Sequence, residues 1–210
     1  MEIKLREVVL DALKEILNIG VGHAAGTLHE LIEMPIKLSV PHVTVISCDD
    51  SLATTCNYGS ESMAMVEMGF DGTLQGSAVL GFPTDGASKL VSLVTGEDDE
   101  VAKLEALRSE ALSEIGNIVL NSVMGSIANM LQQPLNYSVP VFSEKTIVDI
   151  DKLYGQDRNG AILFANTHFI VEELDLQGDI LIVFDLGSFE TFKARICLLY
   201  TSPSPRDWMV

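Results

Sequence analysis

The sequence predicts an α+β fold in which two tandem, pseudo-symmetric halves each pack a long helix on antiparallel strands. Three observations predict it: residue identities that recur 99 positions later in the 210-residue chain, a long helical period opening each half, and β-branched segments after each helix. The apolar fraction of 47% fits one folded core. We expect a single domain over residues 1–196, built from repeats at about 1–99 and 100–196, and a tail over 197–210.

The repeat shows as identical residues at a fixed register. Further along, Gln75-Gly76 matches Gln177-Gly178, which indicates an insertion of three residues in the second half. A tandem duplication is the simplest explanation, with its junction near the acidic run at 97–100. The first-half residues that recur 99 positions later include Ala12, Leu13, Glu15, Ile16, Asn18, Ile19, Gly26, Pro35, Ser39, Val40 and Pro41.

Apolar residues at helical spacing predict a helix over about 4–33 and a second over about 102–132, ended by Pro35 and Pro134. Glycines inside these helices each cost about 1 kcal/mol relative to alanine. We therefore expect them to mark the close approach of another backbone. These glycines are Gly20, Gly22, Gly26, Gly116 and Gly125.

Segments rich in β-branched residues follow each helix and predict strands. A short helix is expected after the last strand of each half, over 84–95 and 189–196. Helix followed by strands, twice, predicts an antiparallel sheet with the helices on one face, continuing across a pseudo-twofold axis. The predicted strands are 37–48, 63–70 and 76–82 in the first half, and 137–141, 146–151, 160–172 and 178–186 in the second.

The chain is strongly acidic, with 13 Lys+Arg against 30 Asp+Glu and a net charge of −17. Binding to phosphates needs clustered cations, so neither nucleic acid nor an anionic membrane is expected as the main partner. Solubility explains the acidity, and adaptation to a saline cytoplasm is the alternative. The sequence has no apolar run of about 20 residues and no signal-peptide core, so we expect a cytoplasmic protein without a membrane span.

The chain is not expected to hold a metal or a cofactor of its own. Its three cysteines, Cys48, Cys56 and Cys197, lack metal-ligand spacing, and its four histidines form no cluster with them. The last residues, 198–210, have no periodicity, and their TSPSPRD core resembles translated sequencing-adapter read-through. The tail is therefore suspected to be non-native.

Each long helix carries a polar stripe at i, i+4, i+7 and i+11. Such a stripe is ordinarily the wet face of an amphipathic helix. Asparagine, however, is a poor helix former in mid-helix, and here it recurs three residues after a glutamate while the outer positions of the stripe differ. We expect the stripes to face solvent or a partner. They are Asp11, Glu15, Asn18 and Gly22 in the first half, and Glu110, Glu114, Asn117 and Asn121 in the second.

The chemistry open to such a stripe is the placement of a water molecule. A carboxamide is no general base, but it accepts and donates hydrogen bonds at once and can therefore orient water. Positioning supplies much of the acceleration in phosphoryl hydrolysis, and a glutamate one turn away offers an ion pair to a cation on the substrate. The catalytic candidates are Glu15, Asn18, Glu114 and Asn117, and the partner-binding candidates are Asp11, Gly22, Glu110 and Asn121.

The two segments DALKEILN and EALSEIGN, followed by Pro41 and Pro140, resemble the motif of the CheC/CheX/FliY family of chemotaxis phosphatases. That motif is Asp or Ser, three residues, Glu, two residues, Asn, 22 residues and Pro. The resemblance covers about residues 5–196, and the doubled motif is similar to that of CheC-type members. Glu110 departs from the motif's first position, which leaves the relative activity of the two sites open.

The resemblance implies a phosphatase that removes phosphate from the aspartyl-phosphate of the response regulator CheY. It implies that Asn18 and Asn117 orient the attacking water, while Glu15 and Glu114 contact a lysine of the regulator. Mg²⁺ is expected on the phosphorylated regulator, and the deamidase CheD is a further implied partner. The alternative is a non-catalytic adaptor for CheD or the flagellar switch, whose stripes serve as docking surface only.

Overall fold

The structure is a computed structural model that describes residues 7–47, 62–97, 104–146, 148–149, 161–171, 174–185 and 187–201. The expectations for Cys48, Cys56 and residues 202–210 fall outside these ranges. The elements, in chain order, are α1 (Glu7–Ile32), β1 (Ile36–Ser47), β2 (Ser62–Gly72), β3 (Gly76–Pro83), α3 (Thr84–Thr95), α5 (Glu105–Leu131), β4 (Leu135–Tyr137), β5 (Val141–Thr146), β6 (Ala161–Val171), β7 (Leu174–Phe184) and α7 (Ser188–Thr201).

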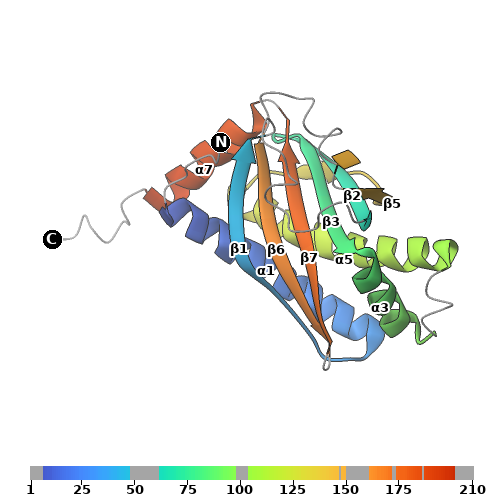
Figure 1. The fold of residues 1–210 in the computed structure, drawn as a ribbon. Coiled ribbons are helices and arrows are strands. Elements are labelled where there is room, and N and C mark those ends of the chain that lie inside the picture. Colours follow the sequence, from blue (N-terminus) through green and yellow to red (C-terminus); the bar gives the residue numbers. More distant parts are fainter. Residues whose placement is uncertain are drawn as a thin grey trace.

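One antiparallel sheet of seven strands forms the centre of the fold. Its order is β1-β6-β7-β3-β2-β4, and β5 also pairs with β2. The long helices α1 and α5 lie together behind the sheet, with α3 and α7 toward its two ends (Figure 1). The predicted α+β class, with helices on an antiparallel sheet, is confirmed.

Strand pairing repeats with the 99-residue offset seen in the sequence. Ile36 pairs with Val171, and Leu135 pairs with Gly72. Leu135 lies 99 positions after Ile36, and Val171 lies 99 positions after Gly72. The β1–β6 register shifts between Ser39 and His42, and the equivalent stretch separates β4 from β5. Two equivalent halves would produce this pairing, although the domain division itself stays a prediction.

Several predicted boundaries are wrong. The expected strand 137–141 is replaced by β4 and the start of β5, because the chain breaks its pairing between Tyr137 and Val141, next to a proline that lacks an N–H. Of the expected strand 146–151, Thr146 ends β5 and 148–149 are helical, while 147, 150 and 151 lie outside the described residues. The helix expected over 189–196 continues as α7 to Thr201, into the segment assigned to the tail.

The slip in register late in the second half is smaller than predicted. Met63 pairs with Pro83, and Ile162, which lies 99 positions after Met63, pairs with Val183. Because Val183 lies 100 positions after Pro83, the offset between β3 and β7 is 100. This indicates an insertion of one residue and not three. The matching dipeptides misled because Gln75-Gly76 lies at the β2–β3 turn, whereas Gln177-Gly178 lies inside β7.

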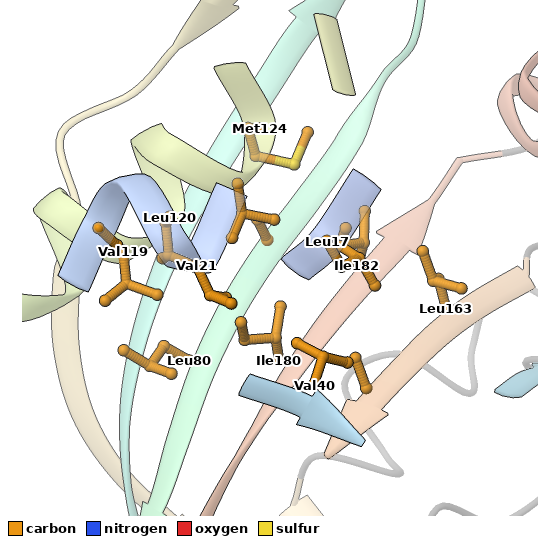
Figure 2. Close-up of a cluster of buried hydrophobic side chains, with 14 of the residues drawn as sticks. Leu17, Val21, Val40, Leu80, Val119, Leu120, Met124, Leu163, Ile180 and Ile182 are labelled. Carbon is orange, nitrogen blue, oxygen red and sulfur yellow. The ribbon is translucent and has the colours of Figure 1, made fainter. Parts of the chain in front are cut away.

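The main core lies between the sheet and the two long helices. Figure 2 shows side chains from α1 and α5 meeting side chains from the strands. Burial of this apolar surface is the dominant stabilising term at this face. A smaller buried cluster, which includes Phe164, occupies the opposite face of the sheet. The labelled core residues in Figure 2 are Leu17, Val21, Val40, Leu80, Val119, Leu120, Met124, Leu163, Ile180 and Ile182.

The helix glycines divide into two groups. A Cβ on Gly20 would lie 2.7 Å from the Cα of Val123, so α1 and α5 approach closely there, and a Cβ on Gly116 would lie 2.5 Å from Cγ1 of Val66 on β2. The predicted close approach holds at Gly20, whereas at Gly116 the neighbour is a side chain. It is wrong for Gly22, Gly26 and Gly125, where a Cβ would meet nothing within 4 Å.

Both long helices end at equivalent positions. Glu33 and Gln132, which lie 99 residues apart, adopt positive φ angles of 55° and 53° directly after the last helical residue. This left-handed conformation ends a helix and turns the chain toward the next strand. Within the described parts of the chain, no helix combines the length and apolar character needed to cross a membrane.

Candidate functional site

The polar stripe of α1 lies on the surface, as predicted. Asp11, Glu15 and Gly22 are exposed and Asn18 is half-buried. Among the described residues, the carboxylates of Asp11 and Glu15 have neither a hydrogen-bond nor an ion-pair partner. They are therefore available to cations on a partner.

The stripe of α5 has the same arrangement with more burial at its C-terminal end. Glu110 and Glu114 are exposed, while Asn117 and Asn121 are half-buried. The two carboxylates again have no side-chain partner within the described ranges. The structure thus brings Glu and Asn together on each helix, one turn apart, in two separate copies.

Asn18 is tied to β1 by its side chain. Its Nδ2 donates to the backbone oxygen of Val40 at 3.1 Å and to that of Lys14 at 2.8 Å, and its Oδ1 accepts from the backbone N–H of Val40 at 2.9 Å. The amide therefore bonds Val40 in both directions. This tie was not predicted, although the fixed spacing between Asn18 and Pro41 was its signal in the sequence.

The position of Val40 explains the spacing. Val40 and Pro41 lie where the β1–β6 register shifts, so neither has a partner in β6. Proline cannot donate to a ladder and is tolerated at such a bulge on an edge strand. The side chain of Val40 is 1% exposed in the core, while its backbone polar groups bond Asn18. The asparagine thus satisfies backbone groups that the bulge leaves unpaired.

Asn117 has a different environment. Its Oδ1 accepts from Nδ2 of Asn121 at 2.6 Å, and that Nδ2 also donates to the backbone oxygen of Asn117 at 2.9 Å. Val139, the counterpart of Val40, is 82% exposed between β4 and β5. That segment is held to β2 through Ser138, whose Oγ accepts from the N–H of Gly69 at 2.9 Å. Within the described ranges, therefore, no strand bonds the Asn117 side chain.

Two apolar side chains border the α1 stripe and were not predicted to do so. Val8 is 55% exposed and Ile19 is 50% exposed. Ile19 lies one turn after Glu15 and next to Asn18, on the open side of the helix. On α5 its counterpart, Ile118, is partly buried against the core. The surroundings of the two stripes therefore differ in apolar exposure.

The chemistry available on these stripes is limited to carboxylates and carboxamides. Within the described residues, His, Cys, Asp and Glu side chains form no group of three that could hold a metal ion. The carboxylates can pair with cations, and the amides can orient water or a polar oxygen. Catalysis at such a site would rest on positioning.

Comparison with known proteins identifies relatives by sequence. No protein-family model matches the chain. It is 29% identical over 142 residues to the CheY-P phosphatase CheC of Bacillus subtilis, a match covering 66% of this chain and 68% of that protein. It is 25% identical over 156 residues to the flagellar motor switch phosphatase FliY of Bacillus subtilis, covering 73% of this chain and 39% of FliY.

Solved structures share the fold. Thermotoga maritima FliY matches with a TM-score of 0.75 and 19% identity, covering 95% of this chain and 98% of that one. The FliM middle domain of H. pylori matches with a TM-score of 0.58 and 12% identity, over 91% and 99%. CheX of Desulfovibrio desulfuricans matches with a TM-score of 0.51 and 13% identity, over 80% and 99%. By its two sequence relatives and its doubled motif the chain is similar to the CheC-type chemotaxis phosphatases, and the solved structures show that it shares their fold.

Proposed function

We propose that this protein dephosphorylates a CheY-like response regulator, using one site on α1 and one on α5. The observation that carries the proposal is the pair of exposed stripes, each with an unpaired glutamate one turn before an asparagine: Glu15 and Asn18, and Glu114 and Asn117. The sequence relative CheC, a CheY-P phosphatase, supports the choice of substrate.

The reaction is the hydrolysis of an aspartyl phosphate. A water oxygen forms a bond to phosphorus in line with the leaving group, and the bond from phosphorus to the aspartate oxygen breaks. The bonding electrons leave with the aspartate carboxylate, and the phosphate and solvent take up the water protons. Because the transition state is loose, placing the water in line supplies much of the acceleration. Asn18 and Asn117 are the groups proposed to place it.

The glutamates are proposed to bind the regulator. Glu15 and Glu114 would each pair with a lysine beside the phosphorylated aspartate, which fixes the water-bearing amide against the phosphorus. Mg²⁺ is expected on the regulator, where it neutralises charge on the phosphoryl oxygens. The outer stripe positions, Asp11, Gly22, Glu110 and Asn121, would extend the contact along each helix. CheD is proposed as a further partner through the resemblance to CheC-type proteins.

The test is phosphate release from a phosphorylated CheY-like regulator. Wild type should accelerate release, and the double variant Asn18→Ala with Asn117→Ala should lose the acceleration while regulator binding is largely kept. Asn129→Ala is a matched control, because Asn129 is exposed on α5 away from the stripe. Unchanged turnover in the double variant would remove the mechanism.

The same measurement distinguishes a phosphatase from the alternative, a non-catalytic adaptor. A wild-type chain that binds the phosphorylated regulator or CheD without speeding phosphate loss would be an adaptor for CheD or the flagellar switch. The structural likeness to the FliM middle domain shows that such a fold is not restricted to proteins named as phosphatases. Binding and turnover therefore need to be measured on one preparation.

A further inference from the structure

The two asparagines differ in the hydrogen-bonding capacity that they have left. A carboxamide offers two N–H donors and two acceptor lone pairs. Asn18 uses both donors, on the backbone oxygens of Lys14 and Val40, and one lone pair, on the N–H of Val40. One acceptor position remains. In this arrangement Asn18 can accept a hydrogen bond from water, but it has no donor left for a phosphoryl oxygen.

Asn117 keeps both donors. Within the described parts of the chain its Nδ2 donates no hydrogen bond, and its Oδ1 accepts one bond, from Asn121. It can therefore accept from the attacking water and donate to a phosphoryl oxygen at the same time. An amide that touches both reacting groups constrains the line of attack more tightly than one that touches only the water.

The cause of the difference is the strand after each helix. In the first half β1 runs unbroken past Val40 and presents its backbone to α1, whereas in the second half the chain breaks between β4 and β5, and Val139 is 82% exposed. Asn121 then takes over the orienting role, with its Nδ2 2.6 Å from Oδ1 of Asn117. The counterpart of Asn121 in the first half is Gly22, which has no side chain to do this.

We infer that the α5 site carries most of the turnover, that Asn121 is a positioning residue which holds the Asn117 amide, and that Asn18 serves mainly to secure the β1 bulge. The inference rests on the proposed function. It assigns unequal roles to two sites that share their glutamate and asparagine.

Single substitutions test it with a phosphorylated CheY-like regulator as the probe. Asn117→Ala should lower kcat about tenfold, and Asn18→Ala should lower it less than about twofold at a temperature where the variant is folded. Asn129→Ala is the control for both. If Asn18→Ala fails to fold, Asn117→Ala alone decides the test. This variant is expected to fold, because Nδ2 of Asn117 donates no hydrogen bond within the described residues. An Asn117→Ala variant retaining more than half of the wild-type kcat overturns the inference.

A positioning role for Asn121 predicts a split between kcat and KM. Asn121→Ala should lower kcat several-fold with KM for the phosphorylated regulator unchanged, and Asn121→Gln, which keeps an amide donor, should recover part of the loss. A general loss of stability would not give rescue by Gln with a constant KM. If Asn121→Ala instead raises KM at constant kcat, Asn121 is a docking residue, and its positioning role is wrong.

The outcomes separate this inference from the function on which it rests. A wild-type chain without activity removes both. An active wild type in which Asn18→Ala and Asn117→Ala lose activity equally, or in which Asn18→Ala loses more, removes only the inference. Hydrogen exchange of the side-chain amides gives a readout independent of turnover, because the Nδ2 protons of Asn18 should exchange more slowly than those of Asn117.

Discussion

Asn18 and Val40 bond each other in both directions, the asparagine amide of α1 donating to the carbonyl of β1 and accepting from its N–H. The pair joins a helix to a strand 22 residues later in the sequence, immediately before Pro41. A residue selected in the sequence for its chemistry thus also has a structural role. This double role makes stability and turnover separable quantities in its variants.

Substituting Asn18 should destabilise the protein more than substituting Asn117. Asn18→Ala leaves the backbone N–H and C=O of Val40 without their partners, and we expect the free energy of unfolding to fall by about 1–3 kcal/mol. Asn117→Ala removes no tie to a strand and should cost less than about 1 kcal/mol. Urea denaturation of the two variants measures the difference. Equal losses would show that the Asn18–Val40 bonds do not stabilise the bulge.

The close approach of the two long helices at Gly20 can be tested with a pair of glycine substitutions. Gly20→Ala places a Cβ 2.7 Å from the Cα of Val123, and forcing α1 and α5 apart should cost about 1–3 kcal/mol. Gly26→Ala is the matched control on the same helix, because its Cβ meets nothing within 4 Å. It should stabilise the protein by about 0.5–1 kcal/mol. Thermal unfolding should show Tm shifts of opposite sign, and shifts of the same sign would contradict the packing.

The two halves differ at an ion pair between a buried arginine and an exposed glutamate. Nη2 of Arg108 lies 2.6 Å from Oε1 of Glu144, and the Arg108 side chain is 9% exposed, with an Nε that has no hydrogen-bond partner. The counterparts 99 positions earlier, Val9 and Val45, are each 1% exposed. The second half therefore carries charges where the first is apolar.

Because Arg108 and Glu144 form an ion pair, the effects of substituting them on the free energy of unfolding should not add. Glu144→Ala leaves the buried guanidinium unpaired and should lower the free energy of unfolding by about 1–3 kcal/mol. Replacing both residues by valine, as in the first half, should cost less than Glu144→Ala alone, since a buried valine at position 108 avoids the cost of keeping an unpaired guanidinium out of water. Denaturation of the single and double variants measures the coupling. A double variant less stable than Glu144→Ala would show that the ion pair is a net stabilising feature.

The two long helices and their polar stripes were predictable because they rest on local periodicity. Helical spacing of apolar residues predicted both long helices to within a few residues, and the polar stripes followed from the same spacing. The break between β4 and β5 was not predictable, because strand pairing there depends on β2 and not on local sequence. For the same reason the tie from Asn18 to Val40 needed the structure.

The exposure of Ile19 shows a second limit. Periodicity assigns a residue to a face of the helix, but how far the sheet and neighbouring helix cover that face is a tertiary property. Ile19 and Ile118 occupy the same register, yet one is half exposed and the other packs against the core. Identical residues in a repeat can therefore differ in what they offer a partner.

Salt should speed the encounter with the regulator. The chain carries a net charge of −17, and we expect the regulator to be acidic around its phosphorylation site, so long-range repulsion slows association. Raising the ionic strength from about 0.05 to about 0.3 M shortens the Debye length and should raise the association rate constant. Stopped-flow mixing measures it. A steep fall in association with salt would show that a local ion pair outweighs the repulsion.

A charge-matched pair of variants isolates that local ion pair. Glu114→Gln and Glu105→Gln each remove one carboxylate from an exposed position on α5, so both reduce the long-range repulsion by the same charge. Only Glu114 lies on the stripe, one turn before Asn117. We expect Glu114→Gln to weaken binding of the phosphorylated regulator about tenfold, or roughly 1.4 kcal/mol, and Glu105→Gln to leave it unchanged or slightly tighter. Titration of each variant with the regulator gives the two dissociation constants. If they are the same, Glu114 contributes only to the overall field of the protein, and its proposed contact with a lysine is wrong.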